Sequence, residues 1–520
     1  MFTPGTERVK LNVPHRPWGN NGNFPTKRDI PFLKANGARA TVIVIDSAGM
    51  EVMPVHPPQD VNAGTIPNTA AYYDAHHPGK FKLPNMEALG LGNIAMLFRR
   101  IIAGVPRALN SAGAFGALAL SSDMTDTPTG HWDAMGLRTG KYPTYPNGIP
   151  KAMMEEIEGA VSRELREEFH FTQDGKNISG TTILEQRGAE SRDGHQPIIY
   201  TSTDSVFQIA WHIGRELKEG EVVLVDENTK IITEEEKDSK TGLIKIRTLA
   251  VNKKELEKMY RVCGIVREYL NNSPDEGLHF LRVIARPFAD RAAIGKNGER
   301  FVRSTSLRRD YVIPPPGKTI LDYAMAAGYF TGAVGKVFDL FSGRGIFRSW
   351  PDPSEHRHLK GDMEGIDFVL EALGQDKPGI ILANLLQCDE DYGHRNNPEG
   401  YAENLMAIDA RLPEIFRAMR PWDIVIIIAD HGNDPTRGLA KLLYERGEIS
   451  EAEYKLRGTN HTREIVPLLI FGDPVLIGAN LGIHQMSDLG AFIAHFLGFR
   501  TSPNGTSFLD QVLDRRIVLG

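Results

Sequence analysis

The chain has 520 residues and a mass of 57.7 kDa. This length is greater than a single hydrophobic core usually holds, so two or three domains are expected. A formal net charge of -6 without a concentrated Lys/Arg stripe argues against nucleic acid as a partner. No apolar run suits a signal peptide or is long enough to span a bilayer, so no membrane association is expected. Two cysteines exclude a disulfide framework, and the sequence therefore predicts a cytoplasmic protein.

The first predicted strand, residues 40–45, consists of Ala, Thr, Val and Ile and ends in Asp46. Residues 121–133 follow later and are rich in hydroxyl groups, with Thr127 and Thr129 on either side of a proline. Ligands of open α/β sheets bind beyond the carboxyl ends of the strands. An acid that directly follows a buried strand is therefore a candidate site residue.

Two turn-rich segments, residues 141–148 and 311–317, predict that a domain is inserted into another. The expected divisions are an N-terminal extension at 1–38, a core at 39–141, an inserted cap domain at 142–313 and the rest of the core at 314–520. Within the insertion we expect helices at 151–169 and 256–270, and a strand and turn at 197–206 followed by a helix through Glu216. Residues 221–251 predict a solvated hairpin, and 281–286 a strand with two arginines.

Strands alternate with helices in the C-terminal part, with strands expected at 379–386, 424–428 and 465–470. The run 424–428 contains only Ile and Val, which predicts a strand that is buried on both faces. Asp430 and His431 follow it after one alanine. Residues 435–458 form a charged, helix-prone insertion. The sequence thus predicts an α/β fold with a mostly parallel sheet and an inserted α/β domain.

Three carboxylates and three imidazoles are expected at the rim of this sheet. They are Asp46, Asp389, His394, Asp430, His431 and His461. Each alone is more often a cap or a polar turn residue, but six such groups suffice for two metal ions about 3.5–4 Å apart, the spacing used in phosphoryl transfer. Oxygen and imidazole ligands without thiolate favour Mn²⁺ or Zn²⁺ and do not decide between them.

Phosphoryl transfer also needs an acceptor, and Thr127 is the natural candidate for a metal-activated nucleophile. The alternative is that Thr127 and Thr129 simply cap a helix. The residues by themselves leave both interpretations open.

A family resemblance emerges from stretches that run in the same order over nearly the whole chain. They lie at 44–47, 83–94, 126–136, 200–210, 282–288, 308–311, 389–395, 401–413, 429–435, 461–464 and 505–509. In these stretches the chain resembles the phosphopentomutases of the alkaline phosphatase superfamily. The metal motifs indicate the superfamily, whereas Thr-Gly-His-Trp at 129–132 and Thr-Ser-Thr-Asp-Ser-Val at 201–206 narrow it to the family.

The resemblance implies an alkaline-phosphatase-like core and a reaction that interconverts (2-deoxy)ribose 1-phosphate and 5-phosphate. Thr127 matches the threonine that carries the phosphoryl group, and a sugar bisphosphate (ribose 1,5- or glucose 1,6-bisphosphate) is the implied activator. Two divalent ions, usually manganese, are implied: one is held by Asp46, Asp430 and His431 beside Thr127, the other by Asp389, His394 and His461. The residues that match sugar-phosphate contacts in the inserted domain are Ser202, Asp204, Arg282, Ile284 and Arg303.

The chain departs from the family's pattern at its N-terminal extension and its two insertions, and at Thr182, where the family has a carboxylate. Alternatives are a metal-dependent phosphatase, or a mutase of the same superfamily that acts on another sugar phosphate. A phosphoglycerate mutase would be expected to use serine where this chain has Thr127, and a scaffold without activity would not need the nucleophile and six ligands. A monomer is compatible with all these features.

Overall fold

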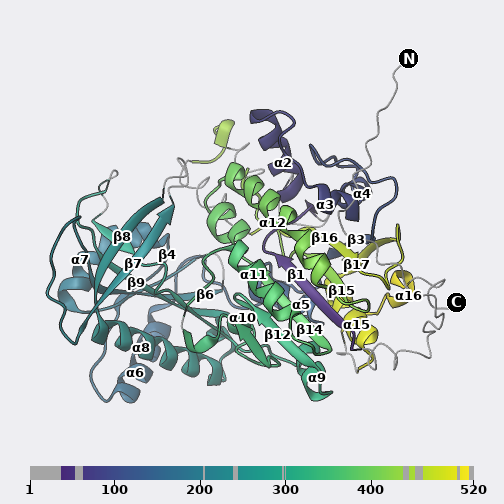
Figure 1. Ribbon diagram of the computed structural model, residues 1–520. Helices are drawn as coiled ribbons and strands as arrows, with labels where there is room; N and C mark the ends of the chain where they lie inside the picture. Colours follow the sequence, from purple (N-terminus) through teal and green to yellow (C-terminus); the bar gives the residue numbers. More distant parts are fainter. Residues whose placement is uncertain are drawn as a thin grey trace. The chain divides into compact units, whose positions relative to one another are not determined.

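The computed structural model describes residues 37–52, 63–202, 205–237, 244–295, 298, 300–355, 357–436, 444–450, 461–499 and 504–513. The chain divides into two compact units, which are considered separately below. Unit 1 comprises Met1–Gly140 and Pro315–Gly520, and unit 2 comprises Lys141–Pro314. Figure 1 shows both units with their helices and strands labelled.

The sheet of unit 1 is mixed and mostly parallel. In spatial order its described strands are β13 (Arg348–Trp350), β12 (Phe330–Val334), β14 (Gly379–Leu385), β1 (Arg39–Ile45), β15 (Ile424–Ile428), β16 (Glu464–Phe471), β3 (Ala114–Ala119) and β17 (Asn480–Gln485), and β2 (Glu51–Val52) pairs with β16. The first five strands in this order, β13, β12, β14, β1 and β15, are parallel to one another, and β3 is parallel to β17. β16 is antiparallel to both of its neighbours β15 and β3. The predicted α/β fold with a mostly parallel sheet is confirmed.

The central strands form because their sequences suit burial on both faces. Every residue of β1, β14 and β15 is buried, and these strands are composed largely of Ile, Val and Leu. Such strands need helices on both sides, and two groups supply them. α11 (Asp362–Leu373) packs on α12 (Pro398–Ala418) and β14, whereas α15 (Met486–Leu497) packs on α5 (Thr127–Ala134), α9 (Ile320–Ala326) and β1.

Unit 1 contains further helices. They are α2 (Thr65–His76), α3 (Pro84–Leu89), α4 (Leu91–Leu97), α10 (Val337–Leu340) and α16 (Leu509–Val512), together with the π-helical turn η4 (Cys388–Gly393). α2 and α3 lie against α12, and η4 joins β14 to the start of α12. This packing holds the segments that follow β1, β14 and β15 at one edge of the sheet.

Unit 2 contains a second mixed sheet. Its described strands run in the order β10 (Phe301–Arg303), β9 (Arg282–Asp290), β6 (Val206–Glu216), β5 (Ile198–Thr201) and β4 (Thr172–Asn177), with β11 (Arg309–Val312) on β9, β8 (Ile244–Asn252) on β6 and β7 (Thr229–Lys237) on β8. α6 (Lys151–Leu165) and α8 (Lys253–Asn272) contribute to a large apolar core with residues of β6 and β9. α7 (Gly180–Gly194) packs with Tyr200 and Phe288 in a smaller core.

The prediction of a helix from the turn at 197–206 through Glu216 is wrong, because Val206–Glu216 forms the strand β6. Phe207, Ile209, Trp211 and Ile213 alternate along this segment and enter the large core. This spacing of two residues matches a pleated strand, and the β-branched and aromatic side chains favour it. Pairing with β9 over nearly its whole length then stabilises the strand.

The structure describes part of the residues for which the other predictions on the insertions were made. β7 and β8 pair antiparallel, which agrees with the hairpin expected at 221–251. Residues 1–36 of the N-terminal extension, and 437–443 and 451–460 of the second insertion, lie outside the described residues. No helix in the described part of the chain is long and apolar enough to cross a membrane.

One buried ion pair at the start of β1 offers a test of the fold. The Arg39 guanidinium donates to Asp423 Oδ2 at 2.8 Å and to the carbonyl oxygens of Leu373 and Gln375, and both charged side chains are buried. Asp423→Ala would leave a buried cation without its carboxylate and is expected to lower the free energy of unfolding by about 3–5 kcal/mol. Urea unfolding would measure the loss.

Asp376→Ala is the matched control, because Asp376 is almost fully exposed and pairs with Arg420 at the surface. Its effect should be no more than about 1 kcal/mol. Equal effects of the two substitutions would contradict the importance of the buried pair.

Candidate metal centre

The predicted metal ligands converge because of the strand directions in unit 1. Asp46 directly follows β1, Asp430 is the second residue after β15, and Asp389 lies in η4 just beyond β14. These three strands are parallel neighbours, so their carboxyl ends share one edge. β16 runs the opposite way, so His461, which precedes it, reaches the same edge. Thr127 begins α5, the helix that follows β3.

Two groups of side chains have the spacing of metal ligands. In the first, ligand atoms of Asp46, Asp430 and His431 lie within 4.8 Å of one another, and in the second those of Asp389, His431 and His461 do. His431 Nε2 lies 3.6 Å from Asp46 Oδ1, 3.4 Å from Asp430 Oδ2 and 3.4 Å from Thr127 Oγ1. The first group is thus adjacent to the predicted nucleophile.

The histidine tautomers favour ligand binding. His431 Nδ1 lies 3.2 Å from the Gly432 carbonyl oxygen, and His461 Nδ1 lies 2.8 Å from that of Thr125. A carbonyl oxygen can only accept, so each Nδ1 donates its proton and each Nε2 keeps a lone pair. The lone pair of His431 faces Asp46 and Asp430, and that of His461 lies 3.6 Å from Asp389 Oδ1.

His394 is arranged differently. Its Nε2 lies 3.1 Å from Asp389 Oδ2 and 3.1 Å from His461 Nε2, and its Nδ1 faces the Asn433 amide nitrogen at 3.4 Å. This geometry suits a proton on Nε2 that is donated to Asp389. The structure therefore brings His394 beside the second group, and its role as a ligand stays a prediction.

The electrostatics of the cluster call for a cation. Burial, together with the Asp430 and Asp389 carboxylates, raises the pKa of Asp46 well above its usual range. Burial also lowers the pKa of His431 to about 4, so this imidazole is neutral at neutral pH. Asp46 Oδ1 and Asp430 Oδ2 are buried without a hydrogen bond from any described residue. Two unpaired carboxylate oxygens beside a histidine lone pair fit a divalent metal ion.

Neighbouring residues orient these ligands and were missed from the sequence. Asn384 donates to Asp46 Oδ2 at 2.9 Å, and Asn433 donates to Asp389 Oδ1 at 2.8 Å. His131 Nδ1 lies 2.8 Å from the Thr127 carbonyl oxygen and 3.3 Å from Asp430 Oδ2. Asn433 and His131 lie within motifs quoted above, but only the folded chain shows what they contact.

All five predicted sugar-phosphate residues belong to unit 2, and one of them, Asp204, is outside the described residues. Ser202 directly follows β5, Arg303 ends β10, and Ile284 is buried in the middle of β9. Arg282 begins β9, and its Nη1 lies 3.8 Å from Asp310 Oδ2.

Two further arginines accompany Arg282. Arg286 shares its face of β9 and donates from Nε to Gln208 Oε1 at 2.9 Å, while Arg308 pairs with Asp310 at 2.7 Å. Burial, with Arg308 and Arg303 nearby, lowers the pKa of Arg286 to about 10. Arg282 and Arg308 share the Asp310 carboxylate, and Arg286 lies near Arg308 and Arg303, so positive charge that suits an anion gathers here. Arg282 and Arg286 are four residues apart, and residues at even spacing in a strand point to the same face, so the sequence could have indicated this shared face.

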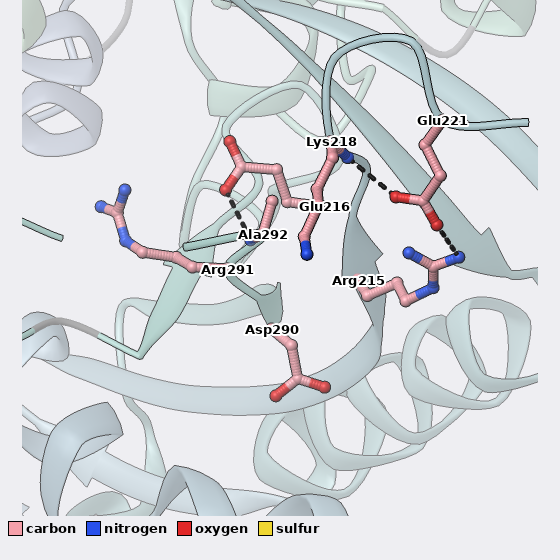
Figure 2. Close-up of a pocket in the computed structure, with 7 residues that line it drawn as sticks. All are labelled: Arg215, Glu216, Lys218, Glu221, Asp290, Arg291 and Ala292. Atoms are coloured by element: carbon pink, nitrogen blue, oxygen red, sulfur yellow. Dashed lines mark hydrogen bonds and ion pairs between the residues drawn. The ribbon is translucent and has the colours of Figure 1, made fainter. Parts of the chain in front are cut away.

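A separate cavity of about 340 Å³ in unit 2 contains none of the predicted site residues (Figure 2). Its charged groups largely satisfy one another: Arg215 pairs with Glu221 at 2.7 Å, and Glu216 accepts a hydrogen bond from the Ala292 backbone. The metal cluster and the arginine group are therefore the better candidates for function.

The chain is similar to known proteins. Residues 354–501 match the metalloenzyme superfamily, so this part of the chain has the fold of a metalloenzyme. The chain is 36% identical over 479 residues to a phosphopentomutase from Desulfitobacterium hafniense, covering 91% of this chain and 100% of the relative. It is 37% identical over 477 residues to one from Herpetosiphon aurantiacus, covering 91% and 99%. The chain belongs to the phosphopentomutase family and is an isomerase.

Among solved structures, phosphoglycerate mutase from Leishmania mexicana aligns with 91% of this chain and 97% of its own at 11% identity, with a TM-score of 0.36.

A metal-binding test follows from Asp46 Oδ1, a buried oxygen that accepts no hydrogen bond from the described residues. Mn²⁺ at 100 times its dissociation constant should stabilise the metal-free wild type by about 2.7 kcal/mol and raise its melting temperature. Asp46→Asn removes a ligand and should largely abolish this increase. Because the substitution also removes repulsion from Asp430 and Asp389, the metal-free variant should melt no lower than the metal-free wild type.

Differential scanning calorimetry after EDTA treatment would measure both effects. A variant that still gains the full Mn²⁺ stabilisation would show that Asp46 is not a ligand.

Proposed function

We propose that the chain interconverts the 1-phosphate and the 5-phosphate of ribose or 2-deoxyribose. Family membership supports this reaction, since the relatives that cover the chain are named phosphopentomutases. The observation that carries the proposal is the place of Thr127, whose Oγ1 lies 3.4 Å from His431 Nε2 at the edge of the carboxylate and imidazole cluster. A hydroxyl in that position can exchange a phosphoryl group.

The first proposed ligand set is the first group of side chains, and the second follows the family resemblance, with His394 in the place that His431 has in the second group. Asp46, Asp430 and His431 would hold one divalent cation beside Thr127, and Asp389, His394 and His461 a second; the family resemblance favours manganese. Such cations, when bound, neutralise negative charge on the transferring group and lower the pKa of an adjacent hydroxyl.

The reaction is proposed to pass through a phosphorylated Thr127. A free hydroxyl of the sugar monophosphate attacks the phosphorus, the bond from phosphorus to Thr127 Oγ1 breaks, and Thr127 regains the proton that the sugar hydroxyl loses. The product is a sugar bisphosphate. Transfer of its other phosphoryl group back to Thr127 releases the isomeric monophosphate, and an added sugar bisphosphate can phosphorylate the enzyme initially.

Binding of the phosphate that is not reacting is proposed for unit 2. Planar guanidinium groups bind phosphate oxygens in pairs, and Arg282, Arg286 and Arg303 supply such groups. Ser202, Asp204 and Ile284 are proposed to contact the sugar. The bisphosphate must be retained while it turns round, because its loss, or attack by water on phospho-Thr127, would convert the mutase into a phosphatase.

A coupled assay with Mn²⁺, ribose 1-phosphate and a catalytic amount of sugar bisphosphate tests the reaction. Formation of ribose 5-phosphate without equivalent release of inorganic phosphate supports a pentomutase. Release of inorganic phosphate alone would identify a phosphatase, and turnover only of another sugar phosphate would identify a different mutase of the superfamily.

The nucleophile can be tested by substitution. Thr127→Ala removes the oxygen that carries the phosphoryl group and should lower kcat by several orders of magnitude. Intact-mass measurement should show a phosphoryl adduct on the wild type after incubation with a sugar bisphosphate and none on the variant.

Thr129→Ala is the control, because Thr129 is buried two residues away and its hydroxyl donates to the Asp126 carbonyl oxygen. An adduct that persists in Thr127→Ala and maps to Thr129 would refute the assignment.

The phosphate site predicts a separate effect. Arg282→Ala should raise KM for ribose 5-phosphate about 30-fold or more, because loss of a charge-assisted contact with phosphate costs about 2–5 kcal/mol. Mn²⁺ binding should be unchanged, and hydrolysis should rise relative to isomerisation as the bisphosphate escapes.

Arg309→Ala is a matched control on the neighbouring strand. The Arg309 guanidinium lies over the Tyr260 ring at 3.7 Å, on a different set of contacts from the arginine group. Steady-state kinetics that are the same for both variants would remove Arg282 from the substrate site.

A further inference from the structure

Glu464 is a buried carboxylate that none of the proposed steps uses. It begins β16, three residues after His461, and its side chain has no exposed surface. It accepts hydrogen bonds from Thr65 N at 2.8 Å, Thr65 Oγ1 at 2.7 Å and Thr462 Oγ1 at 2.5 Å. Burial and the nearby Asp434 carboxylate raise its pKa to about 8. Burying a carboxylate costs free energy unless it is hydrogen-bonded, and these three hydrogen bonds offset that cost.

The carboxylate lies between two loops that carry predicted metal ligands. A Cβ atom added to Gly49 would lie 2.3 Å from Glu464 Oε2, and one added to Gly432 would lie 2.2 Å from Oε1. Gly49 is three residues from Asp46, and Gly432 directly follows His431. Both loops therefore contact Glu464 so closely that each needs a glycine at this point.

A directed chain of hydrogen bonds leads from Glu464 to a third ligand. The Asn433 backbone N–H donates to Thr65 Oγ1 at 3.0 Å, and the Thr65 hydroxyl donates to Glu464 Oε1 at 2.7 Å. The Asn433 side chain donates to Asp389 Oδ1 at 2.8 Å. Glu464 thus connects the segments of Asp46, His431 and Asp389 through Thr65 and Asn433.

We propose that Glu464 is a positioning residue of the metal centre, which acts through Thr65 and the two glycines to hold the ligand loops in their metal-binding geometry. This inference rests on the proposed metal centre but not on the identity of the sugar phosphate. Groups that orient ligands in this way commonly change metal affinity or activity about 10–100-fold when they are replaced.

The test measures Mn²⁺ affinity of the metal-free protein directly, by electron paramagnetic resonance of free Mn²⁺. Glu464→Gln keeps the volume but replaces one acceptor oxygen with an NH₂ donor, and Thr65→Val removes the hydroxyl while keeping its shape. Each should weaken Mn²⁺ binding about 10–100-fold while circular dichroism remains that of the wild type. KM for ribose 5-phosphate at saturating Mn²⁺ should stay within about twofold, because neither residue belongs to the proposed sugar-phosphate site.

Asp409→Asn is the control for loss of a buried carboxylate. Asp409 accepts hydrogen bonds from the backbone of Asn85 and Met86 at the start of α3, away from the ligand loops. The Asp409→Asn substitution should lower the melting temperature without changing the Mn²⁺ affinity.

Folded Glu464→Gln and Thr65→Val proteins with wild-type Mn²⁺ affinity would overturn the inference, as would a wild type that binds no Mn²⁺. Weakened Mn²⁺ binding in a protein without pentomutase activity would support the inference while refuting the proposed reaction.

Discussion

The burial of several carboxylates at one edge of the sheet is the constraint on which the rest of the site depends. Asp46, Asp389 and Asp430 gather there because their parallel strands end side by side and helices cover the faces of the sheet. Asp430 and Asp389 repel Asp46 and raise its pKa, and the neutral His431 carries no charge to offset this repulsion. A divalent cation relieves it, which is why the ligand set and the fold point to the same chemistry.

The geometry around these carboxylates is rigid because the ligands are themselves hydrogen-bonded. Backbone carbonyl oxygens hold the Nδ1 protons of His431 and His461, and asparagine amides orient Asp46 and Asp389. The antiparallel contact between Gly432 and Thr462 joins the two histidine-bearing segments. Such surrounding bonds keep lone pairs directed at a common point before any ion is bound.

Mutase chemistry makes two demands, and different parts of the chain are suited to them. A phosphoryl group must react where negative charge is neutralised at short range, and unit 1 offers Thr127 beside the cluster. In the proposed mechanism the second phosphate of a bisphosphate must be held without reacting, and we propose that the arginine group of unit 2 holds it.

The sequence by itself determined the α/β class, the central strands and the family. Uninterrupted Ile and Val runs can only be buried, and the matching motifs are local. Asp46, Asp430 and His431 could be found because they directly follow such strands. The tertiary structure decided the rest. The two-residue alternation in Val206–Glu216 already favoured a strand, which pairing with β9 stabilises, whereas Glu464, Thr65 and Asn433 acquired their contacts because residues hundreds of positions apart meet at one edge. Contacts of that kind arise from packing, which no local pattern encodes.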